Sequence, residues 1–285
     1  MSMLEQWTTL KILAWTKEYL LSKGVINARL ESEWLLCSAL GLDRVGLYLH
    51  FDKPLNETEL AQYRGMVARR ARREPLQHIL GSQEFCGLDF EVSKDVLIPR
   101  HDTEVLVSEV LKRIQKVDSV LDVGTGSGCV AIILKNGNPQ AKITATDISE
   151  EALIIAKRNA IRHSSDIEFL TGSLFAPVAG RCFDLIVSNP PYIPSEDINS
   201  LDLEVRDYDP ITALDGGFDG LEIYRSLIPE AIMHLNPGGW LILEIGIGQS
   251  KKIEQLFRNV VCYSDTEIKK DSNGIDRVIC AQKRR

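Results

Sequence analysis

The sequence lacks the features that mark several large classes of protein. Its 285 residues contain no apolar run of about 18–20 residues, the length that a membrane-spanning helix needs. The six cysteines are scattered without a Cys-x-x-Cys pair and mostly have apolar neighbours, so we expect buried thiols in a reducing compartment. The five histidines show no metal-ligand spacing, and we predict no metal site. Residues 1–18 lack the pattern of a secretory signal, so we expect a cytoplasmic protein.

Basic residues are outnumbered by acidic residues over most of the chain. The net charge is −7, but residues 1–80 carry 11 Lys and Arg against 9 Asp and Glu, whereas the remainder carries 22 against 31. Phosphate binding depends on clustered Lys and Arg, so residues 81–285 do not favour a long nucleic-acid footprint. We therefore expect two units of different character, no stable nucleic-acid complex and no membrane association. Nothing in the pattern indicates an obligate oligomer, and we expect a monomer.

The first part of the chain is predicted to be a small helical domain, residues 1–75. Its third helix begins with Asn56 as N-cap and Glu59 placed to complete a capping box. Three of the four tryptophans lie in this region, and we expect them to enlarge its core (Trp7, Trp15 and Trp34). Short β-like runs punctuated by Gly81 and Gly87 then predict a hairpin linker over residues 76–97.

From residue 98 to 285 apolar strands alternate with helical stretches. Strands are expected near residues 120–123, 143–146, 167–170, 185–187, 240–245, 261–268 and 277–281. Helices are expected near residues 127–136, 150–162, 220–235 and 249–258. This alternation predicts an α/β domain with a doubly wound, mostly parallel sheet.

A glycine-rich loop follows the first of these strands. The residues are Gly124-Thr125-Gly126-Ser127-Gly128, and glycines there allow a sharp turn and a close approach of a ligand to the main chain. Asp147 ends the next strand, where a carboxylate can accept hydrogen bonds from both hydroxyls of a ribose. The pattern therefore predicts a cofactor that carries a nucleoside. Its spacing is G-x-G-x-G, common in S-adenosylmethionine enzymes, whereas the dinucleotide fingerprint needs a glycine where this chain has Cys129.

A second motif, Asn189-Pro190-Pro191-Tyr192, follows the apolar run at residues 183–188. Open α/β sheets bind ligands at the carboxyl ends of their strands, so this amide is expected at the ligand site. The two prolines stiffen the backbone and remove two N–H donors, which leaves the Asn189 side chain and nearby carbonyls as rigid acceptors. Such acceptors suit a planar NH2 group, either an amide or a nucleobase amine, and Tyr192 offers a flat face beside it.

Taken together, these residues resemble the bacterial release factor glutamine methyltransferases, the PrmC (HemK) family. The resemblance covers almost the whole chain and includes the small helical N-terminal domain. Asn-Pro-Pro-Tyr is shared with other amine and amide methyltransferases, but the Ile-Pro-Arg segment and the acidic loop 202–219 make the match specific. The matching segments are 74–81 (Glu-Pro-Leu-Gln-His-Ile-Leu-Gly), 98–104 (Ile-Pro-Arg-His-Asp-Thr-Glu), 122–128, 189–192, and Asp209-Pro210 with Ala213-Leu214.

The resemblance implies a fold, a cofactor and a reaction. The sheet would be a seven-stranded, Rossmann-like methyltransferase sheet that binds S-adenosylmethionine over residues 124–128, with Asp147 on its ribose and Leu174 and Asn189 also contacting it. The methyl acceptor would be the glutamine of a Gly-Gly-Gln motif in class I peptide chain release factors. The Asn189 side-chain oxygen and the Pro190 carbonyl would accept its amide hydrogens, with Pro191 and Tyr192 completing the substrate site.

Two residues depart from the family pattern. His101 stands where the family usually has proline, and Ser173, near the expected adenine, stands where an acidic residue is frequent. A hydroxyl accepts a hydrogen bond from the adenine amine more weakly than a carboxylate does, so the departure at Ser173 bears on cofactor affinity.

For several other residues the sequence leaves two possible roles open. Asp122 could support the glycine loop or touch the cofactor. Arg100 and Glu104 could line the methionine end of the cofactor or pair with each other. A basic cluster could be a solvated helix face or could contact an acidic surface or RNA (Arg64, Arg69, Arg70, Arg72 and Arg73).

Three other functions compete with this hypothesis. A methyltransferase for a ribosomal-protein glutamine would have the same pocket and a different outer surface. An adenine-amine methyltransferase would need a basic groove and a way to hold an extruded base, which the acidic balance of residues 81–285 disfavours. A non-catalytic cofactor-binding regulator would keep residues 124–128 but would not need Asn189.

Overall fold

The computed structural model describes residues 7–285, so the first six residues of the predicted helical domain lie outside it. The chain divides into two compact units. The helical unit comprises the described residues up to Gly81 together with Asp202–Tyr208, and the sheet unit comprises Ser82–Leu201 and Asp209–Arg285. None of the helices within residues 7–285 is long and apolar enough to cross a membrane.

The helical unit is built from short helices around one core. They are α1 (Thr9–Ser22), α2 (Ala28–Leu40), α3 (Arg44–Leu49), α4 (Glu57–Ala71), α5 (Leu76–Leu80) and α9 (Leu203–Arg206). The capping box predicted for α4 is present, because the Asn56 side chain accepts from the Glu59 backbone N–H and the Glu59 carboxylate accepts from that of Asn56.

The core of the helical unit is mainly aliphatic, and the prediction that tryptophans enlarge it is wrong for two of the three. Trp15 and Trp34 are 51% and 43% exposed. Leu20, Leu35, Leu36 and Tyr63 are fully buried instead, because α1 and α2 carry apolar residues on more than one side and a different side from that of Trp15 and Trp34 packs in the core.

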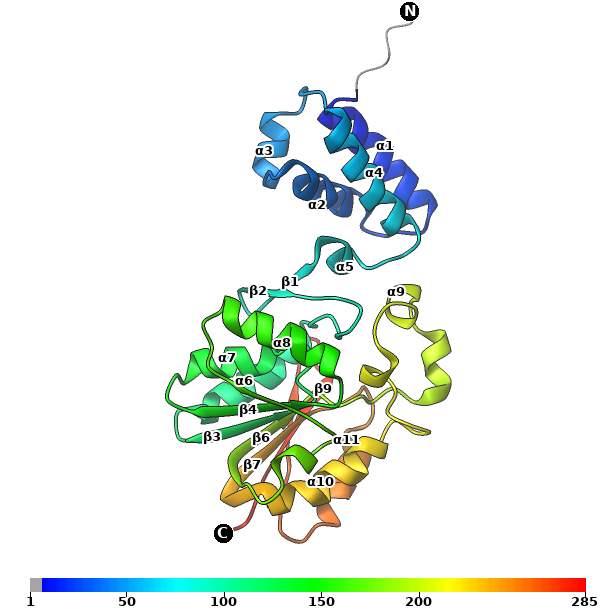
Figure 1. The fold of residues 1–285 in the computed structure, drawn as a ribbon. Coiled ribbons are helices and arrows are strands. Elements are labelled where there is room, and N and C mark those ends of the chain that lie inside the picture. The colour runs from blue at the N-terminus through cyan, green and yellow to red at the C-terminus, as the bar shows by residue number, and fades with distance from the viewer. Residues whose placement is uncertain (1–6) are drawn as a thin grey trace, which may run out of the picture. The chain divides into compact units, whose positions relative to one another are not determined.

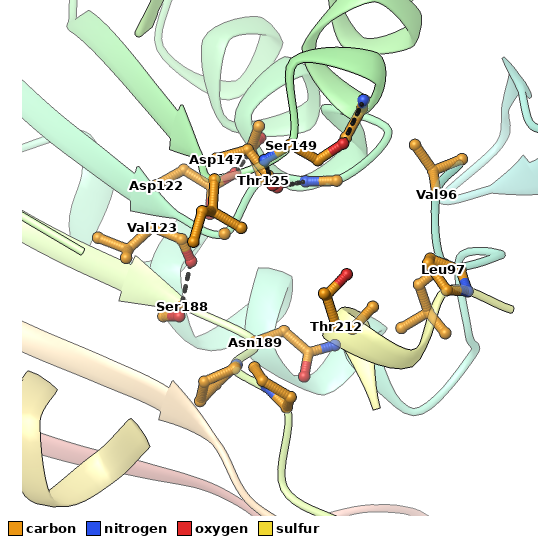
Figure 2. A pocket seen from close by; sticks show the side chains of 18 of the residues that line it. Val96, Leu97, Asp122, Val123, Thr125, Asp147, Ser149, Ser188, Asn189 and Thr212 are labelled. Carbon is orange, nitrogen blue, oxygen red and sulfur yellow. Dashed lines mark hydrogen bonds between the residues drawn. The ribbon is translucent and has the colours of Figure 1, made fainter. Parts of the chain in front are cut away.

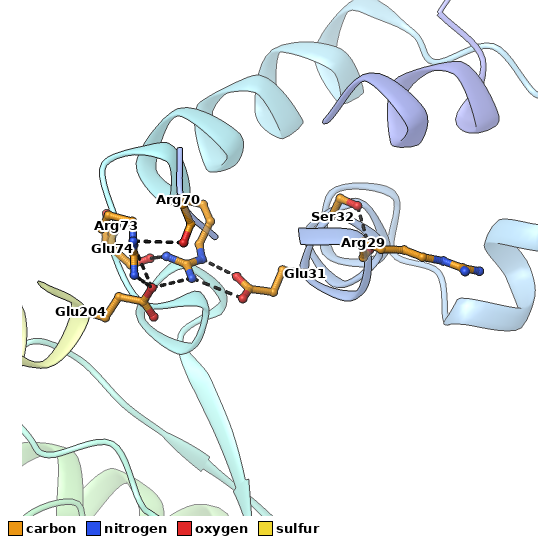
Figure 3. A network of polar contacts seen from close by, with 8 residues as sticks. Arg29, Glu31, Ser32, Arg70, Arg73, Glu74 and Glu204 are labelled. Carbon is orange, nitrogen blue, oxygen red and sulfur yellow. Dashed lines mark hydrogen bonds and ion pairs between the residues drawn. The ribbon is translucent and has the colours of Figure 1, made fainter. Parts of the chain in front are cut away.

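The predicted basic cluster lies on α4 and just after it, and three of its members have carboxylate partners in the helical unit. Arg69 pairs with Glu74, whereas Arg70 bonds Glu31 and Glu204, and Arg73 also reaches Glu204 (Figure 3). Arg70 is buried, so the description of this cluster as a solvated face does not hold for it. Two members are exposed, Arg64 and Arg72.

The hairpin predicted between the two parts is present, but it begins later than expected. Residues 76–80 form α5 in the helical unit, whereas β1 (Ser82–Phe85) and β2 (Leu88–Glu91) pair antiparallel in the sheet unit. Cys86 and Gly87 connect the strands, and both have positive φ, as the two-residue turns that match strand twist require.

The sheet has seven strands in the order β5-β4-β3-β6-β7-β9-β8. The predicted mostly parallel α/β sheet is confirmed. The strands are β3 (Ser119–Val123), β4 (Lys142–Asp147), β5 (Glu168–Thr171), β6 (Phe183–Ser188), β7 (Leu235–Glu244), β8 (Glu267–Lys270) and β9 (Asp276–Gln282). The first five in this order are parallel. The strand β9 pairs antiparallel with both β7 and β8, so β9 runs against the other six strands and β8 runs with the first five. The chain runs outward from β3 to β5 and returns at β6, so the strand order reverses between β3 and β6. Such a reversal opens a crevice beyond the carboxyl ends of the strands.

Helices cover both faces of this sheet (Figure 1). One core contains α6 (Thr103–Ile114) and α7 (Cys129–Gly137), with α8 (Glu150–Arg162) contributing at its edge. The other contains α10 (Glu222–His234) and α11 (Ser250–Arg258). Successive residues of a strand pack into different cores, as Val120 and Leu121 do. The helix α6 was not predicted, although Leu106, Val110 and Ile114 recur on its buried side.

Candidate active site

A pocket of about 580 Å³ opens at the carboxyl ends of β3, β4 and β6, at the reversal of strand order (Figure 2). This volume lies in the range of cofactor and small-molecule sites. The pocket gathers residues that sequence analysis had picked out from separate segments, namely Gly124, Thr125, Gly126, Ser127, Asp147, Leu174, Asn189, Pro190 and Pro191. Two further predicted residues, Gly128 and Tyr192, do not line it.

The glycine loop forms one wall of the pocket. Gly124 and Gly126 have φ of +74° and +56°, and a Cβ placed on either would meet no atom within 4 Å. The main chain is therefore open to a ligand at both positions. Gly128 acts elsewhere, because a Cβ there would lie 3.1 Å from the Ala156 Cβ, so this glycine lets α7 approach α8.

Asp122 lies under this loop and holds it in shape. Its Oδ2 accepts a hydrogen bond of 2.6 Å from the Thr125 hydroxyl. Burial raises the pKa of the Asp122 carboxyl to about 7, and the bond from Thr125 opposes that rise. The residue supports the loop, as one of its two predicted roles required, and it also lines the pocket.

Asp147, at the end of β4, is held by backbone donors on both oxygens. Gly126 N–H donates to Oδ2 at 2.8 Å and Ser149 N–H donates to Oδ1 at 3.0 Å. These bonds fix the carboxylate against the glycine loop, and each oxygen keeps a lone pair that a ribose hydroxyl could use. Figure 2 shows Asp147 and Thr125 on the same side of the pocket.

Asn189 follows β6 directly and faces the pocket from the other side (Figure 2). Just before it, the Ser188 hydroxyl donates to the Val123 carbonyl at 2.6 Å and ties the ends of β6 and β3 together. The Asn189 Nδ2 donates to Thr103 Oγ1 at 3.2 Å. Oδ1 accepts no hydrogen bond from residues 7–285, and neither does the Pro190 carbonyl, so both acceptors are available to a ligand.

Tyr192 points away from the pocket into the core beneath it. Its hydroxyl reaches Glu244 Oε1 at 3.5 Å, and its ring packs with the core that contains α10. Its carbonyl accepts from Gln249 Nε2 at 2.9 Å. Burial raises the pKa of the Tyr192 hydroxyl well above its usual value. The position suits a residue that supports the turn after Asn189.

Arg100 lines the pocket but does not pair with Glu104, so that alternative is wrong. Its Nη2 lies 2.6 Å from Oδ2 of Asp209, whose side chain is fully buried. Glu104 contacts His101 instead. Burial raises the pKa of the Asp209 carboxyl to about 6, and Arg100 opposes the rise. Ser173 also lines the pocket, beside Leu174.

Two polar residues at this site were not singled out from the sequence. Thr103 lines the pocket at the start of α6, and Glu244 ends β7 with its side chain buried. Thr103 lies in the segment 98–104 that carried the family resemblance, and Glu244 is a lone acidic residue at the end of an apolar strand, which is a weak signal of either burial with a partner or function. Within the described residues, no group of three or more His, Cys, Asp or Glu could hold a metal ion.

Two family models match this chain. The family model "PrmC N-terminal domain" matches residues 11–81, and "Methyltransferase small domain" matches residues 100–202. A release factor glutamine methyltransferase of Geobacter sulfurreducens is 56% identical over 275 residues, which are 96% of this chain and 96% of the relative. The chain belongs to the release factor glutamine methyltransferase family.

Other members of the release factor glutamine methyltransferase family are also similar over more than nine-tenths of their lengths. The Koribacter versatilis protein is 41% identical, with 90% of this chain and 92% of the relative covered. The Bacillus subtilis protein is 36% identical, with 96% and 97% covered. The pocket described above therefore lies in a chain that matches these relatives over at least nine-tenths of its length.

Solved structures agree on the fold. A methyltransferase from Pyrococcus furiosus superposes with a TM-score of 0.55 at 22% identity, covering 76% of this chain and 99% of that one. A 16S rRNA N2 G1207 methyltransferase of T. thermophilus, in complex with AdoMet and guanosine, has a TM-score of 0.52 at 16% identity, covering 71% and 50%. At these identities the likeness concerns the fold alone.

Proposed function

We propose that this chain transfers a methyl group from S-adenosylmethionine to the side-chain amide nitrogen of the glutamine in the Gly-Gly-Gln motif of class I peptide chain release factors. The observation that carries the proposal is the pairing of an open glycine loop with a free Asn189 Oδ1 in one pocket. Membership of the release factor glutamine methyltransferase family supports the choice of substrate.

The residues of the pocket fit S-adenosylmethionine. Gly124 and Gly126 leave open space beside the main chain, and Asp147 presents a fixed carboxylate for the ribose hydroxyls. We assign the adenine side to Leu174, with the Ser173 hydroxyl as an acceptor near it, and the side nearest the reaction to Asn189. When bound, this cofactor supplies an electrophilic methyl group on a sulfonium.

In the proposed mechanism, Asn189 and Pro190 hold the amide that is methylated. An amide nitrogen is a poor nucleophile because its lone pair is delocalised into the carbonyl. The Asn189 Oδ1 and the Pro190 carbonyl would accept its two hydrogens, orient the nitrogen and stabilise the positive charge that grows on it. Pro191 and the Tyr192 backbone keep these acceptors in place, and the alignment supplies the proximity term.

The proposed methyl transfer needs no strong base. A nitrogen–carbon bond forms as the carbon–sulfur bond breaks, S-adenosylhomocysteine leaves, and the methylated amide loses one proton to water. In this scheme Asn189 and Pro190 accept hydrogen bonds, and no ionisable side chain removes a proton. We further propose that the enzyme is a monomer, acts in the cytoplasm and forms no stable nucleic-acid complex. The net charge of −7 supports the monomeric state and the lack of a nucleic-acid complex.

The test is transfer of a labelled methyl group to a purified class I release factor. We expect label on the wild-type factor and none on a factor whose Gly-Gly-Gln glutamine is changed to alanine. Parallel reactions use a ribosomal protein and duplex DNA. Label on either of these, with none on the factor, would contradict the proposed substrate. It would leave the proposed role of the pocket in methyl transfer unchanged.

The same assay tests the role of Asn189. Asn189→Ala should lower methyl transfer by at least about 100-fold, the scale of losing one preorganised transition-state contact. Asn236→Ala is the matched control, because its Nδ2 also donates to a neighbour, Asp184, but it does not line the pocket. Normal transfer in Asn189→Ala would disprove the assignment.

A further inference from the structure

The helix α8 turns one side toward the pocket and the glycine loop. At its start, Ser149 is the N-cap, and both Ser149 and Ala152 line the pocket. One turn later Ala156 lies against the loop, because a Cβ on Gly128 would come within 3.1 Å of the Ala156 Cβ. Asn159 follows three positions later, and residues spaced by three and four share one side of a helix. This side therefore leads from the pocket to a buried amide.

Asn159 is fully buried, and its side chain bonds the main chain of two distant segments. Its Nδ2 donates to the Ser127 carbonyl at 2.9 Å and thus holds the end of the glycine loop. Nδ2 also donates to the Glu91 carbonyl at 3.0 Å, and Oδ1 accepts from the Glu91 N–H at 2.7 Å. A reversed amide would place its oxygen against two carbonyls and its nitrogen against an N–H. The three partners therefore fix one orientation of the amide.

The segment that follows Glu91, residues 92–97, contributes another wall of the pocket. Val92 and Val96 form a small buried cluster with two residues of α8, and Val96 and Leu97 line the pocket. Figure 2 shows Val96 and Leu97 across the pocket from Asp147. Asn159 does not line the pocket, so it holds the glycine loop and the start of this segment from behind.

We propose that Asn159 is a positioning residue for S-adenosylmethionine, which sets the distance between the glycine loop and the segment 92–97. Its partners are main-chain atoms, which cannot move away by a change of side-chain rotamer. A pocket whose walls are held at one distance before binding loses less conformational freedom when the cofactor enters, and affinity rises accordingly. This inference rests on the proposed placement of the cofactor over the glycine loop.

The decisive variant is Asn159→Ala, which removes all three hydrogen bonds. We expect the Kd for S-adenosylmethionine, measured by calorimetry on the full chain, to rise about 10-fold or more. The Kd for S-adenosylhomocysteine should rise equally, because this ligand binds without methyl transfer. At saturating cofactor kcat should stay within about threefold of wild type, since Asn189 and Pro190 are unchanged. Asn159→Ser, whose hydroxyl is too short to join both segments, gives the same comparison if the alanine variant does not fold.

Asn138 is the matched control for this change. Its Nδ2 also donates to two main-chain carbonyls, those of Ile114 at 2.9 Å and Val117 at 3.3 Å. Its Oδ1 accepts from the Gln140 N–H at 3.2 Å, and the residue does not line the pocket. Asn138→Ala should lower the thermal midpoint, as Asn159→Ala does, and leave the Kd for S-adenosylmethionine unchanged.

A second control cuts another link between β2 and α8. Arg158 pairs with the Glu91 carboxylate at 2.9 Å, but its side chain is exposed and does not reach the glycine loop. Because exposed ion pairs contribute little, Arg158→Gln should change the Kd less than about twofold. A rise equal to that of Asn159→Ala would overturn the proposal, since the bond to Ser127 would then not be the cause.

The outcomes separate this inference from the placement of the cofactor. An unchanged Kd in Asp147→Asn, which alters the assigned ribose contact, would overturn that placement and this proposal with it. A raised Kd in Asp147→Asn beside an unchanged Kd in Asn159→Ala or Asn159→Ser would overturn the positioning role alone. Equal rises in Asn159→Ala and Asn138→Ala would also overturn it, because they would point to a general loss of stability.

Discussion

Arg70 and Glu204 lie 134 positions apart in the sequence, and the Arg70 Nη2 is 2.8 Å from the Glu204 Oε1 (Figure 3). Arg70 also binds Glu31 and the Glu74 carbonyl, so its guanidinium is enclosed by acceptors. Through Glu204 the segment Asp202–Tyr208 becomes part of the helical unit. Tyr208 adds a second link, because its hydroxyl donates to the Arg72 carbonyl at 2.9 Å.

Replacing Arg70 should therefore be more costly than replacing a typical surface arginine. Arg70→Leu leaves Glu31 without its cation and leaves Glu204 with Arg73 alone, and we expect the free energy of unfolding of the helical unit to fall by about 3 kcal/mol. Denaturant unfolding measures this loss. Arg206→Gln is the control, since within residues 7–285 Arg206 pairs only with its neighbour Asp207, and this variant should change stability by less than about 0.5 kcal/mol. Equal effects of the two changes would contradict the burial argument.

Asp147→Asn tests the assigned cofactor contact. An asparagine cannot accept from both Gly126 N–H and Ser149 N–H and also present two oxygens to a ribose. We expect the Kd for S-adenosylmethionine, measured by calorimetry, to rise at least about 10-fold, and the thermal midpoint to fall modestly because one backbone N–H loses its acceptor. Asp118→Asn, at an exposed position before β3, should leave the Kd unchanged. An unchanged Kd in Asp147→Asn would show that this carboxylate does not bind the cofactor.

Gly220→Ala tests how closely the backbone after Asn189 is packed. Gly220 has φ of +73°, and a Cβ there would lie 2.3 Å from the Tyr192 carbonyl oxygen and 2.6 Å from the Gln249 Nε2. The Tyr192–Gln249 bond would have to shift, so we expect a loss of about 2–3 kcal/mol in stability together with lower methyl transfer.

Gly248→Ala provides the comparison for that change. Its φ is +78°, but a Cβ there meets nothing within 4 Å. The substitution should therefore carry only the backbone strain, about 1 kcal/mol, and leave methyl transfer intact. If both glycine variants lost the same activity, close packing against Tyr192 would not be the cause.

The buried carboxyls predict how stability depends on pH. Burial raises the pKa of Glu244 and Asp122 to about 7 and that of Asp209 to about 6. A carboxyl with a raised pKa in the folded state contributes its full stability below its unfolded pKa of about 4 and loses it as the pH rises through the folded pKa. These three groups should therefore lower the free energy of unfolding as the pH rises from about 4 to about 7.

Glu244→Gln isolates one of these groups, because its amide does not titrate. Relative to wild type, the free energy of unfolding of this variant should increase from pH 5 to pH 8 by about 1–3 kcal/mol. Glu196→Gln, at an exposed position, should show no such trend. A flat difference for Glu244→Gln would mean that the Glu244 carboxyl is not held in its neutral form by burial.

Much of the sheet unit could be predicted from local patterns. The alternation of strands and helices, the glycine loop and the Asn189 turn depend on residues that are close in sequence, and their conformations are set by glycine, proline and apolar periodicity. Since parallel strands all place their carboxyl ends at one edge, these motifs were bound to meet there. The helix α6 was missed because its apolar residues follow an irregular segment, 92–102, that gives no clear start signal.

The sequence by itself determined the family, the sheet and the two motifs that face the pocket, because each is written in a short stretch of chain. Only the tertiary structure decided which way the Asn189 amide is directed, which residue Arg100 pairs with, and which unit holds the segment Asp202–Tyr208. Each of these depends on a hydrogen bond or ion pair between residues far apart in the chain. Such partners are chosen by strand register and burial, and no local pattern specifies them.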